Sequence, residues 1–402
     1  MPSLTFSQEI KCGLENPEAY GVVMNEATKR RVQAIENFTQ KWISNHSQQV
    51  QTRSIITIPV VVHIVWKEDE ENISDLEIEA QIDGLTADFR KLNSNSNNVP
   101  EMFKSLATDT EIEFCIASLD PTGQVKKGIV RRQTGIENMG TPFNGQNRIC
   151  YDEWGGSDAW DPARYVNIWV GQLEAVAGRA TNPGTAPVPE EDGIWIDPNS
   201  FGFFCSSTSN FNLGRTLTHE MGHYLNLFHT WGEGGCNSTD FVDDTPVQSE
   251  PYRNCPSHPQ ESCGSTDMFM NFMDYVDDDC MSLFTFGQKM RMLAALDTLP
   301  RVSLKSSNGC GWITPGNLTL TPDDILVFPN PAKDCVHIDL DLDNNLPIRM
   351  GIYNSVGQAI FSSEVFAKDL RTIDTSKFSN GIYFIVFEAN NQVASKKLII
   401  DK

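Results

Sequence analysis

Thr218-His-Glu-Met-Gly-His-Tyr-Leu-Asn-Leu-Phe-His229 is the stretch on which the interpretation of this chain depends. In a helix, His219 and His223 lie on one face about one turn apart, which suits two ligands of one zinc ion. Glu220, next to the first ligand, is placed to act as a general base on water. If the helix then ends, His229 can return as a third ligand, which leaves one coordination position open for catalysis. A chance HExxH on a surface helix is the alternative, and the third histidine argues against it.

The composition is that of a globular protein with a strong acidic excess. The chain has 402 residues, more than one domain usually contains, so two or three domains are expected. With 31 basic and 53 acidic residues, the net charge of −22 argues against nucleic acid as a partner. The charge favours cationic ligands such as calcium and basic peptides, although solubility alone is a sufficient explanation for it.

Cysteine usage indicates an oxidising, extracytoplasmic location. Four of the ten cysteines cluster just beyond the histidine motif: Cys236, Cys255, Cys263 and Cys280. A second zinc site bound by cysteines is the alternative, but the chain has no CxxC pair. The pairing of the others is left open: Cys115, Cys150, Cys205, Cys310 and Cys335.

No segment has the features of a membrane span or of a signal peptide. The longest apolar run, residues 55–66, is interrupted by polar residues and by Pro59, and it is too short to cross a bilayer. The first residues, MPSLTFSQEIKCG, have neither a charged n-region nor an apolar h-region. We therefore expect a secreted protein whose signal peptide lies outside the printed sequence.

The expected secondary structure predicts an α/β domain after a helical N-terminal part. In residues 1–53, apolar residues at helical spacing form one stripe, Val32, Ile35, Phe38 and Trp42. A β-branched run over residues 58–65 predicts a strand covered on both faces. Ser74 and Glu77 form a capping box for a helix ending near Asn93, with Ile78, Ile82, Leu85, Phe89 and Leu92 on its buried face. Further strands are expected at residues 111–117, 165–170 and 193–196, so strands alternate with helices.

Later segments complete the expected domain order. Residues 177–181 predict a short edge strand, where Gly178 and Ala180 can hold an extended peptide by main-chain hydrogen bonds; an ordinary strand is an equal alternative. A closing helix is expected at residues 284–297 and a linker at 301–324. Residues 325–402 contain short alternating strands between turns, which fits a small β-sandwich.

The histidine motif, its lead-in Gly214-Arg-Thr-Leu-Thr-His219 and a distal Asn271-Phe-Met-Asp-Tyr275 together resemble the pappalysin family of metzincin metallopeptidases. The resemblance spans residues 12–297, only weakly before the catalytic part. It implies an α/β (α+β) catalytic domain at residues 54–300, with a twisted mixed sheet and an active-site helix. It also implies a small, mostly helical prodomain at residues 1–53.

The resemblance assigns roles to single residues. His219, His223 and His229 would bind zinc, and Glu220 would be the general base and proton shuttle. Met273 would lie beneath the metal, and Tyr275 would stabilise the oxyanion of the transition state, as a phenol donor can. Without the family, Met273 and Tyr275 would be interpreted as core residues.

Asn226 is a departure from the family pattern, because most metzincins have glycine at this position. The residue ends the helix and is expected to adopt a left-handed conformation, for which asparagine is the next-best residue. The turn to His229 should therefore survive with little strain.

The resemblance further implies two disulfides, Cys236–Cys263 and Cys255–Cys280; the residues alone allow three pairings of these four cysteines. Between them, Asp240-Phe-Val-Asp-Asp-Thr-Pro246 resembles the family's calcium loop. Asp240, Asp243 and Thr245 are the candidate calcium ligands, because clustered oxygen donors suit calcium. A solvated acidic turn is the alternative.

Asp278 matches an aspartate at the floor of the pocket that binds P1′, the residue after the cleaved bond. A buried carboxylate there would favour arginine or lysine. The alternative is that Asp277, Asp278 and Asp279 face solvent.

Latency is the role that the resemblance assigns to Cys12, which precedes Gly13 near the start of the chain. Its thiolate would occupy the fourth zinc position, whereas an incidental free thiol is the alternative. If the enzyme cuts before basic residues, cleavage between Thr52 and Arg53 would release the prodomain. Cleavage after Arg53 is the close competitor.

The last block, residues 325–402, resembles the type A sorting domain of the type IX secretion system. The matching pieces are Val327-Phe-Pro-Asn-Pro-Ala-Lys-Asp334, Ile352-Tyr-Asn-Ser-Val-Gly-Gln358, residues 374–384 and the terminal Lys396-Lys-Leu-Ile-Ile-Asp-Lys402. It implies an immunoglobulin-like sandwich that addresses the protein to the secretion machinery and is removed outside the cell. An accessory adhesion domain is the alternative.

The leading prediction is therefore a secreted or cell-surface zinc endopeptidase, made as a zymogen and acting as a monomer. It would cleave protein or peptide substrates before arginine or lysine. A zinc-containing adhesin or binding protein that no longer catalyses is the alternative from another class, and the presence of Glu220 argues against it. A zinc hydrolase of non-peptide amides is the third possibility, and the expected edge strand argues against that one.

Overall fold

The computed structural model describes Cys12 and residues 25–46, 55–173, 176–202, 211–310, 321–322, 325–340, 347–366, 371–389 and 392–402. The chain forms two compact units. The larger unit ends at residue 311, and the smaller unit contains residues 312–402 and two short earlier segments.

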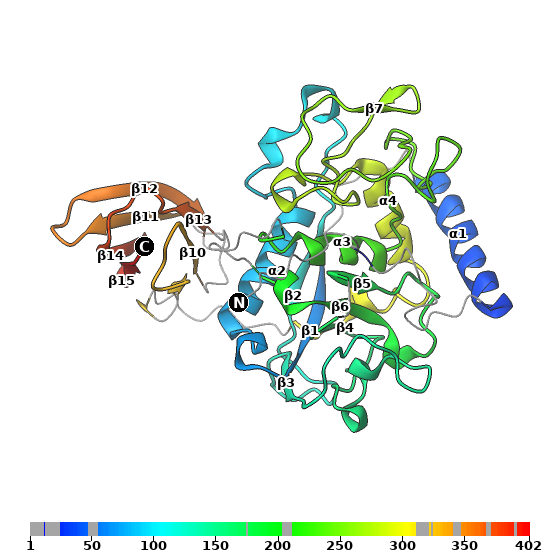
Figure 1. The fold of residues 1–402 in the computed structure, drawn as a ribbon, viewed down its shortest axis with the longest axis horizontal. Helices are drawn as coiled ribbons and strands as arrows, with labels where there is room; N and C mark the ends of the chain where they lie inside the picture. The colour runs from blue at the N-terminus through cyan, green and yellow to red at the C-terminus, as the bar shows by residue number, and fades with distance from the viewer. Residues whose placement is uncertain are drawn as a thin grey trace, which may run out of the picture. The chain divides into compact units, whose positions relative to one another are not determined.

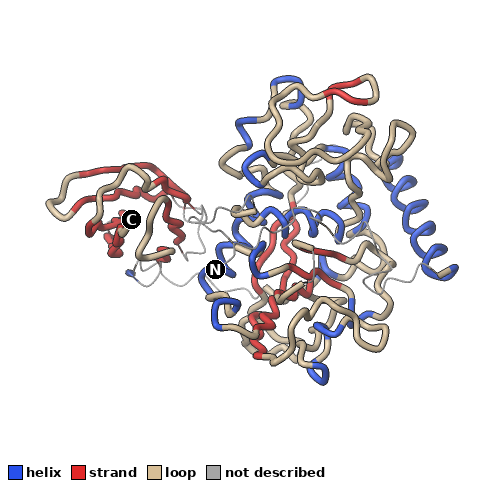
Figure 2. Tube along the Cα trace, in the orientation of Figure 1, coloured by secondary structure: helices blue, strands red, loops and turns tan. Residues whose placement is uncertain are grey.

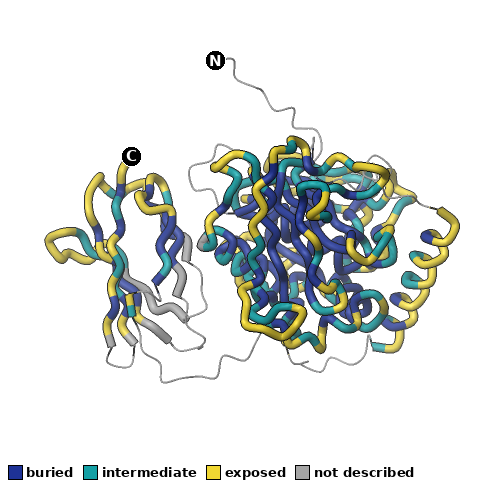
Figure 3. The backbone as a smooth tube through the Cα atoms, turned by 90° about the horizontal axis from the view of Figure 1, so that it is seen from below, coloured by how far each residue is buried: buried dark blue, intermediate teal, exposed yellow. Residues whose placement is uncertain are grey.

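The larger unit has a mixed sheet. The interior of this unit is formed by the buried residues drawn in dark blue in Figure 3. The central strand of the sheet, β1 (Ile56–Trp66), pairs in parallel with β2 (Ile112–Ile116) and then β3 (Ile129–Gln133) on one side. On the other side follow β4 (Val166–Val170), β6 (Gly193–Ile196) and the antiparallel edge strand β5 (Gly178–Ala180). Residues 58–65 of β1 are buried throughout. The predicted mixed sheet is confirmed, whereas β3 was not expected because its sequence, IVRRQ, is largely polar.

Within the described residues, four α-helices accompany this sheet: α1 (Glu26–His46), α2 (Asp75–Phe89), α3 (Arg215–Tyr224) and α4 (Phe286–Ala295) (Figure 1). The predicted helix that includes Ile82, Leu85 and Phe89 is present, with these three side chains buried. It ends at Phe89, earlier than expected, and Leu92 is 66% exposed instead of buried. Between α3 and α4 the described chain consists mostly of loops, with one small hairpin of β7 (Glu261–Ser262) and β8 (Ser265–Thr266) (Figure 2).

The inner face of helix α1 includes Val32, Ile35 and Trp42 of the expected apolar stripe, but not Phe38. Thr39 and Trp42 are buried, whereas Phe38, an expected member of the apolar stripe, is 36% exposed. Glu36 and Thr39 also belong to this face, because they form hydrogen bonds with Arg291 and Asn226.

The larger unit extends beyond the expected boundary at residue 300. Arg301 and Leu304 are fully buried, and Cys310 is joined to Cys115 at the end of β2 by a disulfide. The segment expected as a linker over 301–324 therefore contributes its first ten residues, 301–310, to the larger unit.

The smaller unit is all-β in its described C-terminal part. One antiparallel sheet has the order β13 (Arg371–Asp374), β10 (Cys335–Leu340), β9 (Ile325–Phe328). The other has the order β12 (Ala359–Phe366), β11 (Pro347–Asn354), β14 (Gly381–Ala389), β15 (Gln392–Ile400). Residues from both sheets share one core, among them Val327, Ile338, Ile352, Ile385 and Leu398. This confirms the predicted β-sandwich.

Candidate metal centre and active site

Helix α3 carries the histidine motif and is buried along its whole length. It ends in a Schellman motif: Leu227 N–H donates to Gly222 O, and Asn226 N–H donates to His223 O. Asn226 has a φ of 73°, in the left-handed region that this motif requires. The turn sends the chain back over the helix, so that His229 reaches the other two histidines.

Three imidazole nitrogens converge at this site. The Nε2 atoms of His219 and His223 are 3.0 Å apart, and His229 Nε2 lies 3.2 Å and 3.0 Å from them, respectively. A tetrahedral zinc ion with ordinary Zn–N bonds separates its ligand atoms by about 3.3 Å. The spacing therefore fits three ligands of one ion.

The tautomers of two of these histidines are set by main-chain carbonyls. His219 Nδ1 lies 2.8 Å from Phe272 O, and His223 Nδ1 lies 2.9 Å from Leu227 O. A carbonyl can only accept, so each Nδ1 carries the proton and each Nε2 presents its lone pair to the centre.

Burial favours the neutral form of two of these histidines. Desolvation lowers the pKa of His223 to about 4 and that of His229 well below its usual value, where the neighbouring histidines add to the effect. Neutral imidazole is the form that binds metal.

Cys12 supplies a fourth donor. Its side chain is fully buried, and its Sγ forms one group with the three histidines in which all ligand atoms lie within 4.8 Å of one another. One sulfur and three nitrogens are a donor set that suits zinc. Within the described part of the chain, no other cluster of three or more His, Cys, Asp or Glu side chains is placed to hold a metal.

Glu220 and the edge strand β5 meet at this centre. Glu220 is fully buried, and a Cβ atom on Gly178 would lie 2.9 Å from Glu220 Cγ and equally close to Thr216 Cγ2. Glycine therefore allows β5 to approach α3. The other side of β5 is bridged by Cys12, which pairs with Gly178 in parallel orientation.

The segment from Asn271 to Tyr275 forms a turn beneath α3. Met273 Sδ is so close to Gly222 that a Cβ there would lie 2.5 Å away. The Asn271 side chain accepts from Met273 N–H at 2.9 Å and exchanges hydrogen bonds with Gln288 of α4. The ring of Tyr275 lies 5.0 Å from that of His229 and is 2% exposed.

Trp231 belongs to this site but was missed by the sequence analysis. Its ring stacks on His229 with centroids 4.3 Å apart and meets the Tyr275 ring edge-on at 4.7 Å. Cys12, Trp231 and Tyr275 form one buried cluster. Its position two residues after the third histidine was the available signal.

Asp278 is buried at the start of α3, which excludes the alternative of a solvent-facing residue. Its Oδ2 accepts from Leu213 N–H at 3.0 Å and from Arg215 N–H at 3.2 Å. The Arg215 guanidinium donates to the main-chain oxygens of Asp278 and Met281. Helix N-terminus and guanidinium thus both stabilise negative charge here.

The candidate calcium ligands are only partly together. Thr245 Oγ1 donates to Asp240 Oδ2 at 2.7 Å, and both residues are buried, whereas Asp243 is exposed. Burial raises the pKa of Asp240 to about 7. Asp244 instead binds Thr285 Oγ1 and Gly287 N–H at the start of α4.

Disulfides join Cys236 to Cys263 and Cys255 to Cys280, the pairing that the resemblance implies. Cys335 is also disulfide-bonded, and Cys150 is a buried thiol.

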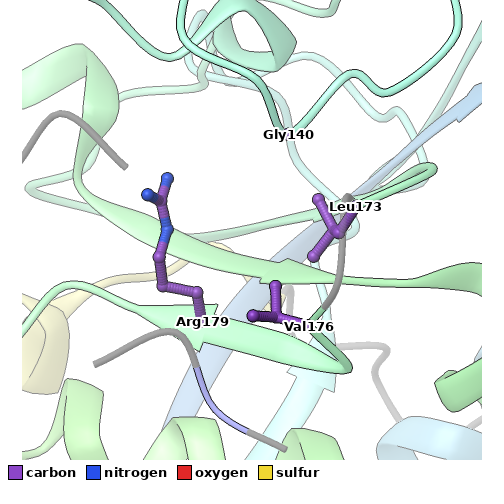
Figure 4. A pocket seen from close by; sticks show the side chains of 4 residues that line it. All are labelled: Gly140, Leu173, Val176 and Arg179. Atoms are coloured by element: carbon purple, nitrogen blue, oxygen red, sulfur yellow. The ribbon is translucent and has the colours of Figure 1, made fainter. Parts of the chain in front are cut away.

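A small pocket lies beside β5, lined by Gly140, Leu173, Val176 and Arg179 (Figure 4). Its volume of about 10 Å³ gives room for one water at most. It is therefore no substrate site.

A three-histidine centre on a buried helix, beside a mixed sheet and above a methionine-containing turn, defines a zinc metalloprotease of the metzincin class. Residues 150–297 match the family model of pregnancy-associated plasma protein-A. The chain belongs to this family of peptidases, the pappalysins. Residues 326–401 match the secretion system C-terminal sorting domain, so the protein is secreted or held at the cell surface.

Solved structures and curated relatives agree with this assignment. The chain is 36% identical to a mutant promirolysin of Tannerella forsythia, covering 76% of this chain and all of that one, with a TM-score of 0.66. Mature mirolysin with a cleaved peptide is 39% identical and covers 65% of this chain and all of its own, with a TM-score of 0.61. An extracellular metalloprotease of Arthroderma benhamiae is 29% identical over 71% of this chain and 89% of its own length. Among the described residues, none of the helices has the length and apolar character that a membrane crossing requires.

Proposed function

We propose that this secreted zinc metalloprotease is an endopeptidase in which Glu220 is the general base and which is made in a latent form. The observation that carries the proposal is the convergence of three imidazole Nε2 atoms beside a buried carboxylate and an edge strand. His219, His223 and His229 would hold the zinc ion, which supplies Lewis-acid polarisation of water and of the scissile carbonyl.

The chain's own residues perform the remaining steps. Ala177 O and Thr181 N–H form hydrogen bonds on the β6 side of β5, with Asp197 N–H and Gly193 O. Because main-chain groups alternate along a strand, those of Gly178 and Ala180 point away from β6, where they bind the extended substrate. Glu220 takes the proton of the attacking water and passes it to the departing amine nitrogen. The Tyr275 hydroxyl donates to the oxyanion, Met273 supports the histidines from below, and Asn226 sets the turn to His229.

Cys12 is the proposed latency residue. It contributes the fourth donor of the metal group and bridges Gly178, so it occupies both the open ligand position and the edge of the substrate strand. Cleavage at Thr52–Arg53, or after Arg53, falls outside the described residues. Replacing Cys12 by Ala should shorten the time to full activity, and an unchanged activation rate would reject this role.

Asp278 is the proposed selector of arginine or lysine at P1′. Its support is a buried carboxylate at the start of the active-site helix. Sequencing of the fragments cut from a denatured protein mixture tests it. New N-termini other than Arg or Lys, or the same N-termini from Asp278→Asn, would remove this role.

Calcium at Asp240, Asp243 and Thr245 is also proposed, as a stabilising ion. A buried carboxylate whose pKa is about 7 would gain from a cation. If the melting temperature of the chelator-treated protein does not rise when calcium is added back, this proposal is wrong. The sorting domain would deliver a monomeric enzyme through the secretion machinery and then be removed.

The decisive experiment compares the enzyme with Glu220→Ala and Glu220→Gln after an added protease has removed the prodomain from each of them. Loss of general-base catalysis should lower kcat by about 10² to 10⁴ while zinc content stays at one per chain. Glu233→Gln, an exposed glutamate beyond His229, is the matched control and should leave kcat unchanged. Cleavage that persists in Glu220→Ala, or that ignores a chelator, would overturn the mechanism.

A further inference from the structure

Helix α1 contacts the rest of the larger unit through a buried ion pair, 24 residues along the chain from Cys12. Arg291 of α4 donates through two guanidinium nitrogens to the two carboxylate oxygens of Glu36, at 3.0 Å and 2.8 Å. The Arg291 side chain is 0% exposed and that of Glu36 is 16% exposed. Burial acts to raise the pKa of Glu36, but the hydrogen bonds and charge of Arg291 outweigh it, so this pKa is lowered.

The same contact reaches the turn between the second and third histidines. Arg291 Nε–H donates to Asn226 O at 3.2 Å, and Asn226 Nδ2 donates to Thr39 Oγ1 of α1 at 3.2 Å. Thr39 is fully buried. The main-chain oxygen of Asn226 therefore accepts from Arg291, and its side-chain amide donates to α1.

Two more hydrogen bonds extend the contact along the helix. Trp42 Nε1–H donates to Asp297 Oδ2 at 2.7 Å, and Arg31 Nε–H donates to Gly184 O at 3.1 Å. Arg31 and Trp42 are about 16 Å apart along a helix axis. The surface on the larger unit thus comprises Gly184, Asn226, Arg291 and Asp297, and we call it the α1 site.

We propose that the α1 site is a second binding site for the prodomain, which holds residues 25–46 independently of Cys12 and keeps the prodomain bound after the chain is cut. The inference rests on the proposed function only in that residues 1–53 are a prodomain to be cut off. The specific occupant is α1 itself, because Glu36, Thr39 and Trp42 are matched to three partners at defined distances.

The two contacts reinforce each other through the tether between them. Twelve residues, 13–24, separate Cys12 from the described start of the α1 segment. A tether of this length holds a detached Cys12 at a local concentration on the order of millimolar. Return of Cys12 to the histidines is therefore an intramolecular step for as long as α1 stays bound.

The test uses the full chain with Glu220→Ala, which cannot process itself, and with residues 47–52 replaced by the recognition sequence of a site-specific protease. After cutting, the prodomain that remains bound is followed over time on a column that holds the C-terminus. Cys12 or Cys12→Ala is combined with wild-type α1, Glu36→Gln or Trp42→Phe. Glu26→Gln, an exposed glutamate of α1, is the control.

The expected result is that the Cys12→Ala prodomain stays bound. Adding Glu36→Gln should speed its release about tenfold to hundredfold, because a buried guanidinium loses its carboxylate. Trp42→Phe should act in the same direction, and Glu26→Gln should have no effect. If Cys12→Ala alone releases the prodomain as fast as the double variants do, the α1 site is overturned. That outcome would not affect the latency role of Cys12. The latency role is tested separately, by the activation rate of Cys12→Ala in the enzyme that keeps Glu220.

Discussion

At the scale of single residues, the active-site helix is supported from behind by a buried acid. Thr218 Oγ1, next to His219, donates to Asp88 Oδ2 at 2.8 Å, and Arg215 lies 3.5 Å from the same carboxylate. Asp88 is 6% exposed, and burial raises its pKa to about 6 despite Arg215. The hydrogen bond from Thr218 and the charge of Arg215 therefore do not fully offset the cost of burying the ionised Asp88 carboxylate.

Asp88 should make the stability of the larger unit depend on pH. Its folded pKa lies above the unfolded value of 3.8, so its stabilising contribution is full below about pH 4 and is lost as pH rises through about 6. The loss amounts to at most about 3 kcal/mol. Asp88→Asn cannot titrate, so its stability relative to wild type should be higher at pH 8 than at pH 4.5. Urea unfolding in the Glu220→Ala background, with Glu101→Gln as an exposed control, measures this; equal differences at both pH values would refute it.

The structural role of a residue could be predicted from the sequence when its partners are close to it along the chain. The left-handed turn at Asn226 follows from the helix-ending pattern, since the Schellman bonds join neighbouring residues. Trp231 stacks on His229, which is close to it in sequence. Its contact with Tyr275 could not be predicted in the same way, because Tyr275 is distant in sequence and is brought close only by the fold. Asp88 and Thr218 are 130 residues apart, and no pattern in the sequence relates them.

At the scale of elements, the contact between β5 and α3 positions the base. Gly178 lies against Glu220 Cγ, Thr216 Cγ2 and Ile196 Cδ1, each of which would be 2.9 Å from an added Cβ. The neighbours are a helix that is buried throughout and the next strand, so neither element has room to retreat.

Gly178→Ala should therefore displace Glu220 and lower kcat/KM by about tenfold to hundredfold, since small misplacements of a catalytic group are costly. The zinc content should not change, because the three atoms nearest to the added methyl group belong to Glu220, Thr216 and Ile196, none of which is a proposed zinc ligand. Gly135→Ala is the control, as an added Cβ there meets nothing within 4 Å. Full activity of Gly178→Ala would show that β5 yields to the methyl group.

Elements with strong local patterns were predicted well, and their partners were not. The buried run of β1 and the closing helix α4 are where the sequence places them, within a few residues. Of the predicted stripe of α1, Trp42 is buried and Val32 and Ile35 are partly buried, whereas Phe38 is exposed. Apolar periodicity cannot reveal that the partner surface offers Arg291 and Asn226, which select Glu36 and Thr39.

At the scale of the molecule, residues just beyond α4 tie the larger unit together. Arg301 is fully buried and donates to Asp192 before β6, to Tyr224 O at the end of α3 and to Thr181 O beyond β5. Its guanidinium lies 3.5 Å from the Tyr224 ring centroid. Residues 301–324 have the composition of a linker. Their described contacts with the larger unit depend mainly on the Arg301 side chain and on one disulfide, and two residues hardly change the composition of a segment.

Two truncated chains should separate the composition-based boundary from the structural one. A chain that ends at residue 311 should keep the peptidase activity and the melting temperature of the larger unit. A chain that ends at residue 300 lacks both Arg301 and Cys310, so Asp192 is left buried without its partner and β2 loses its crosslink. We expect this chain to lose at least about 3 kcal/mol of unfolding free energy. Replacing Cys115 and Cys310 by Ser in the longer chain isolates the disulfide's share. If both truncations melt at the same temperature, Arg301 does not hold α3, β5 and β6 together.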